Sequence, residues 1–181
     1  THGLYEASLS NNLLDKSNWN WIGAYKQKNN PIDAELLKLV NTLNPGGPKN
    51  NLFGFLSFKN NQLYTCCGGY GEGYDLHRDA AIKMMKDGEW TTYEDSLETK
   101  TGVRFQDMMA MDIDPTNPTR AMASGKSGLY EFRNGKFYHL YTTDNSPLRS
   151  AIADGNKNYV LTTGLTFDKQ GNLWCLNVSL I

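Results

Sequence analysis

The sequence predicts an all-β fold: a fragment of a β-propeller with about three to four four-stranded antiparallel blades and room for one short helix in an insertion. An internal repeat is the first observation, because Phe58, Ile113 and Phe167 occupy equivalent places in units 55 and 54 residues apart. Turn chemistry is the second, since Asn134-Gly135 and Asp87-Gly88 separate alternating runs and tolerate the positive φ angles of tight hairpins. The third is that no strong helical stretch could serve as the crossover of a parallel sheet.

The repeated unit is an alternating strand, a polar turn and a second alternating strand. Its three copies cover residues 56–66, 111–123 and 165–175, and the middle copy has a longer, proline-bearing turn. A second repeat lies over the first, because Gly3-Leu4-Tyr5-Glu6 recurs as Gly128-Leu129-Tyr130-Glu131. Each period therefore holds about four short strands, as a propeller blade does. We expect one partial propeller domain over 1–181, with repeat cores near 52–93, 105–141 and 160–181 and an irregular insertion near 8–45.

One segment departs from this pattern. Apolar residues at near-helical spacing between Ile32 and Leu43 predict a short helix, and Asn44-Pro45-Gly46-Gly47-Pro48 ends it. We expect the helix to pack on a blade as a local cover; the alternative is a helix that docks a partner.

The number of blades bears on whether the chain is complete. About three to four blades lie near the low end of the 4 to 8 that close a ring, and an open arc exposes apolar sheet faces and unpaired edges. We therefore expect a fragment of a longer protein, or two chain ends that pair to complete one blade.

Charge and hydropathy exclude several classes of partner. Lys and Arg number 18 against 19 Asp and Glu, so no broad basic field exists to hold nucleic acid. No apolar run approaches the roughly 20 residues that cross a bilayer, and the first residues lack the features of a signal peptide, so an export signal would lie upstream. The three cysteines include adjacent Cys66 and Cys67, whose side chains face opposite ways in a strand. We expect inert, half-buried thiols, with a redox-active vicinal disulfide as the alternative.

Two glycine-containing motifs resemble phosphate-binding loops and fail on spacing. Gly125-Lys126-Ser127 lacks the upstream glycine of a P-loop, because Arg120 stands there, and it leads into a strand. We expect a turn between two strands. Gly68-Gly69-Tyr70-Gly71-Glu72-Gly73-Tyr74 has Tyr74 in place of the third glycine of a dinucleotide fingerprint. Its glycines are expected to let the backbone loop out at the rim of a blade.

Aromatic residues supply the candidate ligand-binding positions, because flat rings stack on sugars and peptide strands. The candidates are Trp19, Trp21, Tyr25, Tyr70, Tyr74, His77 and Arg78. The alternative for the tryptophans is structural packing between blades, and we expect such a buried place for Trp174.

No catalytic or metal-binding constellation is visible. His2, His77 and His139 are scattered, and none lies at ligand spacing from a Cys or another His. Asp112 and Asp114 share one strand face and leave glycosidase chemistry open. The favoured alternative is that Asp114 caps the following turn. We expect no catalytic residue, no metal and no cofactor, and hence a protein that is not an enzyme.

Three elements resemble the two-component-regulator propeller repeat of Gram-negative bacteria. They are Asp168-Lys169-Gln170-Gly171-Asn172-Leu173-Trp174, Gly128-Leu129-Tyr130-Glu131-Phe132 and Asn145-Ser146-Pro147-Leu148. Two more stretches, 48–51 leading to Gly68-Gly69 and 112–118 leading to Gly128, are similar to the PorZ-like branch. The matches cover about residues 45–177, whereas 8–45 does not align to a blade. An Asp-box of sialidases is a rival for 168–174, but it is broken by one extra residue.

The resemblance implies a non-enzymatic binding or scaffold module of a bacterial envelope protein, periplasmic or at the cell surface, similar to a PorZ-like component of type IX protein secretion. Its implied partners are other blades or domains of a longer chain, envelope proteins or a glycan ligand. The alternative is a periplasmic propeller of a hybrid two-component regulator that senses oligosaccharides. A glycan-active propeller enzyme is the third, least favoured reading.

Overall fold

A computed structural model describes residues 4–22, 35, 53–71, 74–152 and 156–179. The chain divides into two compact units, Thr1–Pro45 and Gly46–Ile181, and each is described by itself. Of the helix predicted between Ile32 and Leu43, only Glu35 belongs to the described residues. The predicted single domain and the predicted pairing of the two chain ends stay predictions.

The first unit contains a short antiparallel ribbon. Strands β1 (Leu4–Glu6) and β2 (Asn20–Ile22) pair with Leu4 opposite Ile22. A 3-10 helix, η1 (Lys16–Asn18), precedes β2, and the Asp15 carboxylate starts it by accepting a hydrogen bond from the Ser17 amide at 2.9 Å.

The second unit holds three antiparallel sheets, which we number in chain order. The first sheet has the order β3-β4-β7-β8, and the second has the order β9-β10-β11-β12. The third sheet is the pair β13-β14, and a two-stranded ribbon, β5-β6, extends from the end of β4. The bounds are β3 (Phe53–Lys59), β4 (Gln62–Cys67), β5 (Tyr70–Gly71), β6 (Tyr74–Asp75), β7 (Ile82–Lys86), β8 (Glu89–Thr92), α2 (Glu98–Thr101), β9 (Ala110–Ile113), β10 (Arg120–Gly125), β11 (Gly128–Arg133), β12 (Lys136–Tyr141), β13 (Thr162–Phe167) and β14 (Leu173–Asn177).

Tight turns connect neighbouring strands in the first two sheets. Asp87-Gly88 and Asn134-Gly135 have positive φ angles, 50° and 85° in one pair and 49° and 73° in the other. Each pair joins strands whose flanking residues are directly opposite, so both hairpins predicted from these dipeptides are confirmed.

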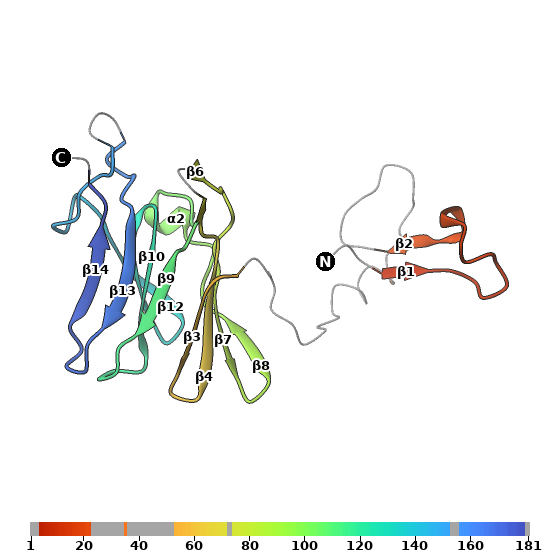
Figure 1. Ribbon diagram of the computed structural model, residues 1–181, viewed down its shortest axis with the longest axis horizontal. Coiled ribbons are helices and arrows are strands. Elements are labelled where there is room, and N and C mark those ends of the chain that lie inside the picture. Colours follow the sequence, from red (N-terminus) through yellow and green to blue (C-terminus); the bar gives the residue numbers. More distant parts are fainter. Residues whose placement is uncertain (1–3, 23–34, 36–52, 72–73, 153–155, 180–181) are drawn as a thin grey trace. The chain divides into compact units, whose positions relative to one another are not determined.

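The three sheets stack face to face within the second unit (Figure 1). We name the two faces of each sheet by the order of the sheets in the sequence. The N-side face is on the side of the earlier sheets, and the C-side face is on the side of the later sheets. One apolar core fills the space between the C-side face of the first sheet and the N-side face of the second, with Cys66 and Ile82 against Met111 and Tyr130. A second core packs Met122 against Leu165 and Phe167.

The Asp112 carboxylate ties the three inner strands together. It forms an ion pair with Lys59 of β3 and accepts a hydrogen bond from the Phe167 amide of β13 at 2.8 Å. The Thr166 hydroxyl adds a third contact at 3.2 Å. Because Asp112 itself lies on β9 and is buried, one side chain links all three sheets near their inner edge.

The predicted fold class is confirmed: the second unit is a run of propeller blades made of four-stranded antiparallel meanders. The described residues include two such sheets and the inner pair of a third, where the sequence predicted about three to four blades. No sheet among them is parallel.

The prediction that Trp174 is buried between blades is wrong. The side chain is 62% exposed, and its indole N–H donates to Asp168 at 3.1 Å. Trp174 lies on the C-side face of the third sheet, where no further sheet among the described residues covers it. Burial on that face depends on a neighbouring sheet.

Candidate functional site

A polar pocket of about 350 Å³ opens where connecting segments from several repeats converge. Its walls come from the end of β6 and the segment after it, the segment after α2, the β10–β11 turn and the segment before β13. The lining residues are Asp75, His77, Val103, Arg104, Gln106, Lys126, Ser127, Asn156, Asn158 and Tyr159. Loops at one end of a blade stack are a usual place for a ligand site, because the sheets hold them in fixed positions.

Asp107 fixes the shape of one wall. Its buried carboxylate accepts hydrogen bonds from the backbone amides of His77 at 3.0 Å and Arg78 at 2.9 Å. The Arg78 carbonyl in turn accepts from the Asp107 amide at 2.9 Å. Both His77 and Asp107 have positive φ angles, 54° and 52°, so these reciprocal bonds hold two residues in a sparsely populated backbone region.

Lys126 supplies a buried positive charge to the lining of the pocket. Its ammonium lies 3.2 Å from a carboxylate oxygen of Asp75, 3.2 Å from one of Asp107 and 3.4 Å from Nδ1 of His77. The Tyr159 hydroxyl donates to the other Asp75 oxygen at 2.8 Å. These bonds couple the turn after β10 to segments far away in the sequence and make the walls rigid.

Gln106 has a side-chain acceptor that is available to a ligand. The residue is 8% exposed, and its buried side-chain oxygen Oε1 has no hydrogen-bond partner among the described residues. An unsatisfied buried acceptor costs about 1–3 kcal/mol, so a donor from a ligand or a water molecule is favoured at this place.

The same cluster resembles a metal site in composition only. Asp75, His77 and Asp107 each place one ligand atom within 4.8 Å of the others. The Lys126 ammonium, however, already forms an ion pair with both carboxylates, at 3.2 Å from each. A divalent cation would have to displace it against like-charge repulsion, so the donor set fits a buried lysine better than a metal ion.

The residues proposed as ligand contacts from the sequence fall in different places. His77 lines the pocket, and Arg78 lies beside it with its guanidinium 3.5 Å from the Gly68 carbonyl. Tyr70 lies on β5 opposite Asp75, and Tyr74 lies on β6 opposite Gly71. Trp19 and Trp21 belong to the first unit, where Trp19 is part-exposed and donates to the Leu13 carbonyl at 3.0 Å.

Tyr25 lies outside the described residues. Sequence reasoning did not select the four residues that organise the pocket: Asp75, Asp107, Lys126 and Tyr159. Lys126 carried a signal, because it sits in the turn examined as a phosphate loop, but its charged partners lie 19 or more residues away along the chain.

The structure confirms the turn predicted for the first glycine-containing motif and describes part of the second. Gly125 pairs with Gly128, so Lys126 and Ser127 form a two-residue turn between strands, as predicted. Gly68 has φ 121°, and a Cβ there would lie 2.6 Å from the Met108 amide nitrogen. This glycine therefore permits a close backbone approach beside the pocket.

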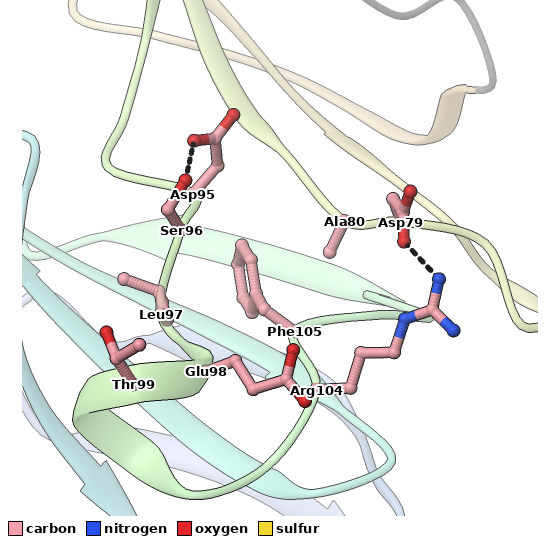
Figure 2. Close-up of a pocket in the computed structure, with 9 residues that line it drawn as sticks. All are labelled: Asp79, Ala80, Asp95, Ser96, Leu97, Glu98, Thr99, Arg104 and Phe105. Atoms are coloured by element: carbon pink, nitrogen blue, oxygen red, sulfur yellow. Dashed lines mark hydrogen bonds and ion pairs between the residues drawn. The ribbon is translucent and has the colours of Figure 1, made fainter.

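A second, larger hollow of about 790 Å³ lies beside α2 (Figure 2). Asp79, Asp95 and Glu98 make its rim acidic, and Phe105 contributes an apolar wall. Arg104 points to Asp79, with 2.9 Å between the guanidinium and the carboxylate (Figure 2). This hollow suits a cationic group by charge, and its polar residues lie on α2 and on the connecting segments around it.

The carboxylates considered for glycosidase chemistry are both engaged. Asp112 holds the inner strands, as described above. Asp114 accepts hydrogen bonds from the Thr116 amide at 2.9 Å and the Thr116 hydroxyl at 2.7 Å, so the predicted cap of this turn is confirmed. Burial opposes ionisation of Asp114, but these bonds and Arg120 outweigh it and lower the pKa of the carboxyl.

Cys66, Cys67 and Cys175 form no disulfide in the structure. Cys66 and Cys67 are both fully buried, which is deeper than the half-burial expected. Burial, with a smaller contribution from the neighbouring Cys67, raises the pKa of the Cys66 thiol to about 12. Such a thiol is almost entirely protonated at neutral pH and is a poor nucleophile.

Fold and site together define a segment of a β-propeller with a rigid polar pocket at one end of the blades. No family model matches the chain, and no curated protein matches it. Among solved structures, the chain is similar to PorZ of Porphyromonas gingivalis, described as an essential bacterial surface component of the type IX secretion system. The TM-score is 0.64 at 23% identity, over 72% of this chain and 17% of the PorZ chain.

The chain thus spans about a sixth of the length of the protein it matches. At this identity the likeness concerns the fold alone. Within the described part of the chain, no helix has the length and apolar character needed to span a membrane.

Proposed function

We propose that this chain is a non-catalytic propeller module of a bacterial envelope protein, which binds and scaffolds partners outside the cytoplasm in the manner of a PorZ-like component of type IX secretion. The observation that carries the proposal is the fold likeness to a segment of PorZ, a surface protein of that system. The proposed partners are further blades or domains of a longer chain, other envelope proteins and a glycan.

A role without catalysis is supported by four carboxylates that already form structural contacts. Asp112 joins three strands, Asp114 caps a turn, and Asp75 and Asp107 neutralise a lysine. General acid or base catalysis needs a carboxyl that is free to exchange a proton with a substrate. These groups instead hold the scaffold in place.

Ligand binding is supported at the pocket around Lys126. Asp75 and Asp107 both contact the Lys126 ammonium, so it offers no unpaired positive charge to an anionic ligand. The unpartnered Gln106 oxygen can accept a hydrogen bond from a hydroxyl or amide group of a ligand. Asn156 and Asn158 also line the pocket and have side chains that can form hydrogen bonds. A sugar residue has this chemistry, which is why a glycan is the proposed ligand.

The secretion role can be tested in the source bacterium. Residues 53–177 are deleted from the gene, and the surface delivery of type IX cargo is compared with that of an exported protein that uses another route. We expect loss of the type IX cargo alone. Normal secretion combined with a lost transcriptional response to oligosaccharides would replace this proposal with the sensor alternative.

Glycan binding can be tested on the purified chain with a panel of bacterial surface oligosaccharides. Gln106→Leu is expected to weaken the best-bound oligosaccharide by roughly tenfold, since it removes one buried hydrogen bond. Asn172→Leu, in the distant β13–β14 turn, serves as the matched control. Equal binding by both variants would place the ligand elsewhere.

A further inference from the structure

One wall of the pocket around Lys126 combines a hydrogen-bond acceptor with an apolar side chain. Gln106 is buried, and its Oε1 has no hydrogen-bond partner among the described residues. Val103 belongs to the same segment after α2, lines the pocket and packs in part against the apolar core between the first two sheets. This wall can therefore accept one hydrogen bond and cover one small apolar group.

The segment before β13 forms another wall and carries donors. The Asn156 Oδ1 accepts a hydrogen bond from the Asn158 amide at 3.1 Å, which orients the Asn156 carboxamide. A carboxamide also has two N–H donors, so this side chain can donate to a ligand in the pocket. The Tyr159 hydroxyl donates to Asp75 at 2.8 Å and holds the tyrosine in the lining, where its ring offers a flat apolar surface.

The charged side chains of the lining already have partners. Lys126 forms ion pairs with Asp75 and Asp107, and Arg104 forms one with Asp79 at 2.9 Å. A phosphate or carboxylate of a ligand would have to compete with these carboxylates, and an ammonium group with these cations. A neutral ligand that has both a donor and an acceptor avoids this competition.

A secondary amide with a methyl group matches the arrangement of the two walls. In a trans amide the N–H and the C=O point in opposite directions, and the acyl methyl lies on the same side as the N–H. The N–H and the methyl can thus face Gln106 and Val103, which share one wall, while the carbonyl accepts from Asn156 on the other.

We propose that this pocket binds the acetamido group of an N-acetylated amino sugar. At about 350 Å³ it lies near the small end of the roughly 300–1,000 Å³ of ligand pockets, which suits one sugar ring. A hydroxyl in place of the acetamido group can satisfy the Gln106 oxygen, but it leaves Val103 uncovered and the Asn156 donor unused. The inference rests on the glycan binding proposed above and narrows it to one class of sugar.

Two trisaccharides that differ only in this group provide the test on the purified chain. Triacetylchitotriose and cellotriose share a β-1,4-linked glucose backbone and carry acetamido or hydroxyl groups at C2. By titration calorimetry we expect the chain to bind triacetylchitotriose roughly tenfold or more tightly, because one methyl group and one further hydrogen bond are gained. In saturation-transfer NMR, the acetyl methyl protons are expected to receive the strongest transfer from the protein.

Two substitutions assign the preference to the first wall. Gln106→Leu is expected to weaken the binding of triacetylchitotriose by roughly tenfold. Val103→Ala is expected to weaken it by about threefold and to leave the binding of cellotriose unchanged, which a merely structural role of Val103 would not do. Val178→Ala makes the same change at an exposed valine outside the pocket and serves as the control. Circular dichroism melts establish that each variant is folded.

The outcomes separate this inference from glycan binding in general. Equal affinity for the two trisaccharides, binding of neither, or saturation transfer that spares the acetyl methyl protons would each overturn the acetamido assignment. If an oligosaccharide without an acetamido group binds instead and Gln106→Leu weakens it, glycan binding stands and the acetamido assignment fails. If no oligosaccharide binds, both fail.

Discussion

Glu131 is a buried charge of the second sheet that accepts several hydrogen bonds. Its side chain is 1% exposed, and it accepts hydrogen bonds from Arg133 at 2.9 Å and from the Tyr141 hydroxyl at 2.7 Å. Arg120 adds a third at 3.2 Å and also contacts Asp114. Burial by itself would raise the pKa of Glu131, but these bonds outweigh it and hold the pKa below its ordinary value of 4.5.

A lowered folded pKa makes the stability contribution of Glu131 dependent on pH. The contribution is fully present above the unfolded pKa and is lost as the pH falls through the lower folded pKa. We expect Glu131→Gln to reduce the free energy of unfolding by about 2 kcal/mol at neutral pH, because charged hydrogen bonds are weakened, and by less at pH well below 4.5.

Urea unfolding at the two pH values measures this difference. Glu89→Gln, at an exposed carboxylate of β8, is the control and should change little at either pH. An equal loss for Glu131→Gln at both pH values would assign the effect to packing and not to charge.

Thiol accessibility gives a second prediction at the scale of single residues. Cys175 is part-exposed, whereas Cys66 and Cys67 are buried. In the folded protein we expect Ellman's reagent to modify Cys175 first, and all three thiols only after denaturation. Cys175→Ser should therefore remove the fast phase. A fast phase that persists in this variant would mean that the first sheet opens readily.

At the scale of elements, the β10–β11 hairpin depends on one glycine. Gly128 has φ 113°, and a Cβ there would lie 2.1 Å from the Tyr141 carbonyl oxygen of the neighbouring strand β12. Gly88 also has a positive φ, 85°, but no atom lies within 4 Å of its added Cβ. Comparing substitutions at the two positions therefore separates the effect of backbone strain from that of steric overlap.

We expect Gly128→Ala to cost roughly 3 kcal/mol or more of unfolding free energy, because β12 has to move, and Gly88→Ala to cost about 1 kcal/mol from backbone strain alone. Thermal or chemical unfolding of both variants provides the comparison. Similar losses would indicate that β12 yields easily and is loosely held in the second sheet.

The elements were largely predictable because their signals are local. Alternation and dipeptides such as Asn134-Gly135 specify strands and hairpins within a few residues. The pocket could not be predicted from the sequence, because Lys126 contacts Asp75 and Asp107 only after separate segments have come together. The sequence signal at His77 was a nearby glycine-rich stretch, which marked the correct region without its charged partners.

At the scale of the whole molecule, the Asp112 carboxylate joins the three sheets. We expect Asp112→Asn to lower the free energy of unfolding by about 3 kcal/mol, because it leaves the Lys59 ammonium without its counter-ion and weakens the bond to the Phe167 amide. Asp144→Asn is the matched control, since it breaks an exposed pair with Lys157 and should leave stability unchanged within error. Equal effects would show that Asp112 is not a structural link.

The exposure of Trp174 is also decided at the scale of the whole molecule. A strand pattern assigns a side chain to a face, but whether that face is dry depends on what lies next to the sheet. Tyr64 and Trp174 hold equivalent positions and differ in exposure for that reason. A prediction of burial from one repeat therefore requires knowledge of its neighbours.

The three-way contact of Asp112 also affects how the chain melts. Stacked repeats normally couple only to adjacent repeats, so that an array can fray from one end. Here Lys59 of the first sheet and Phe167 of the third share one carboxylate on the second. Loss of either outer sheet thus weakens the hold on the other, and heating should produce a single calorimetric transition for residues 53–177.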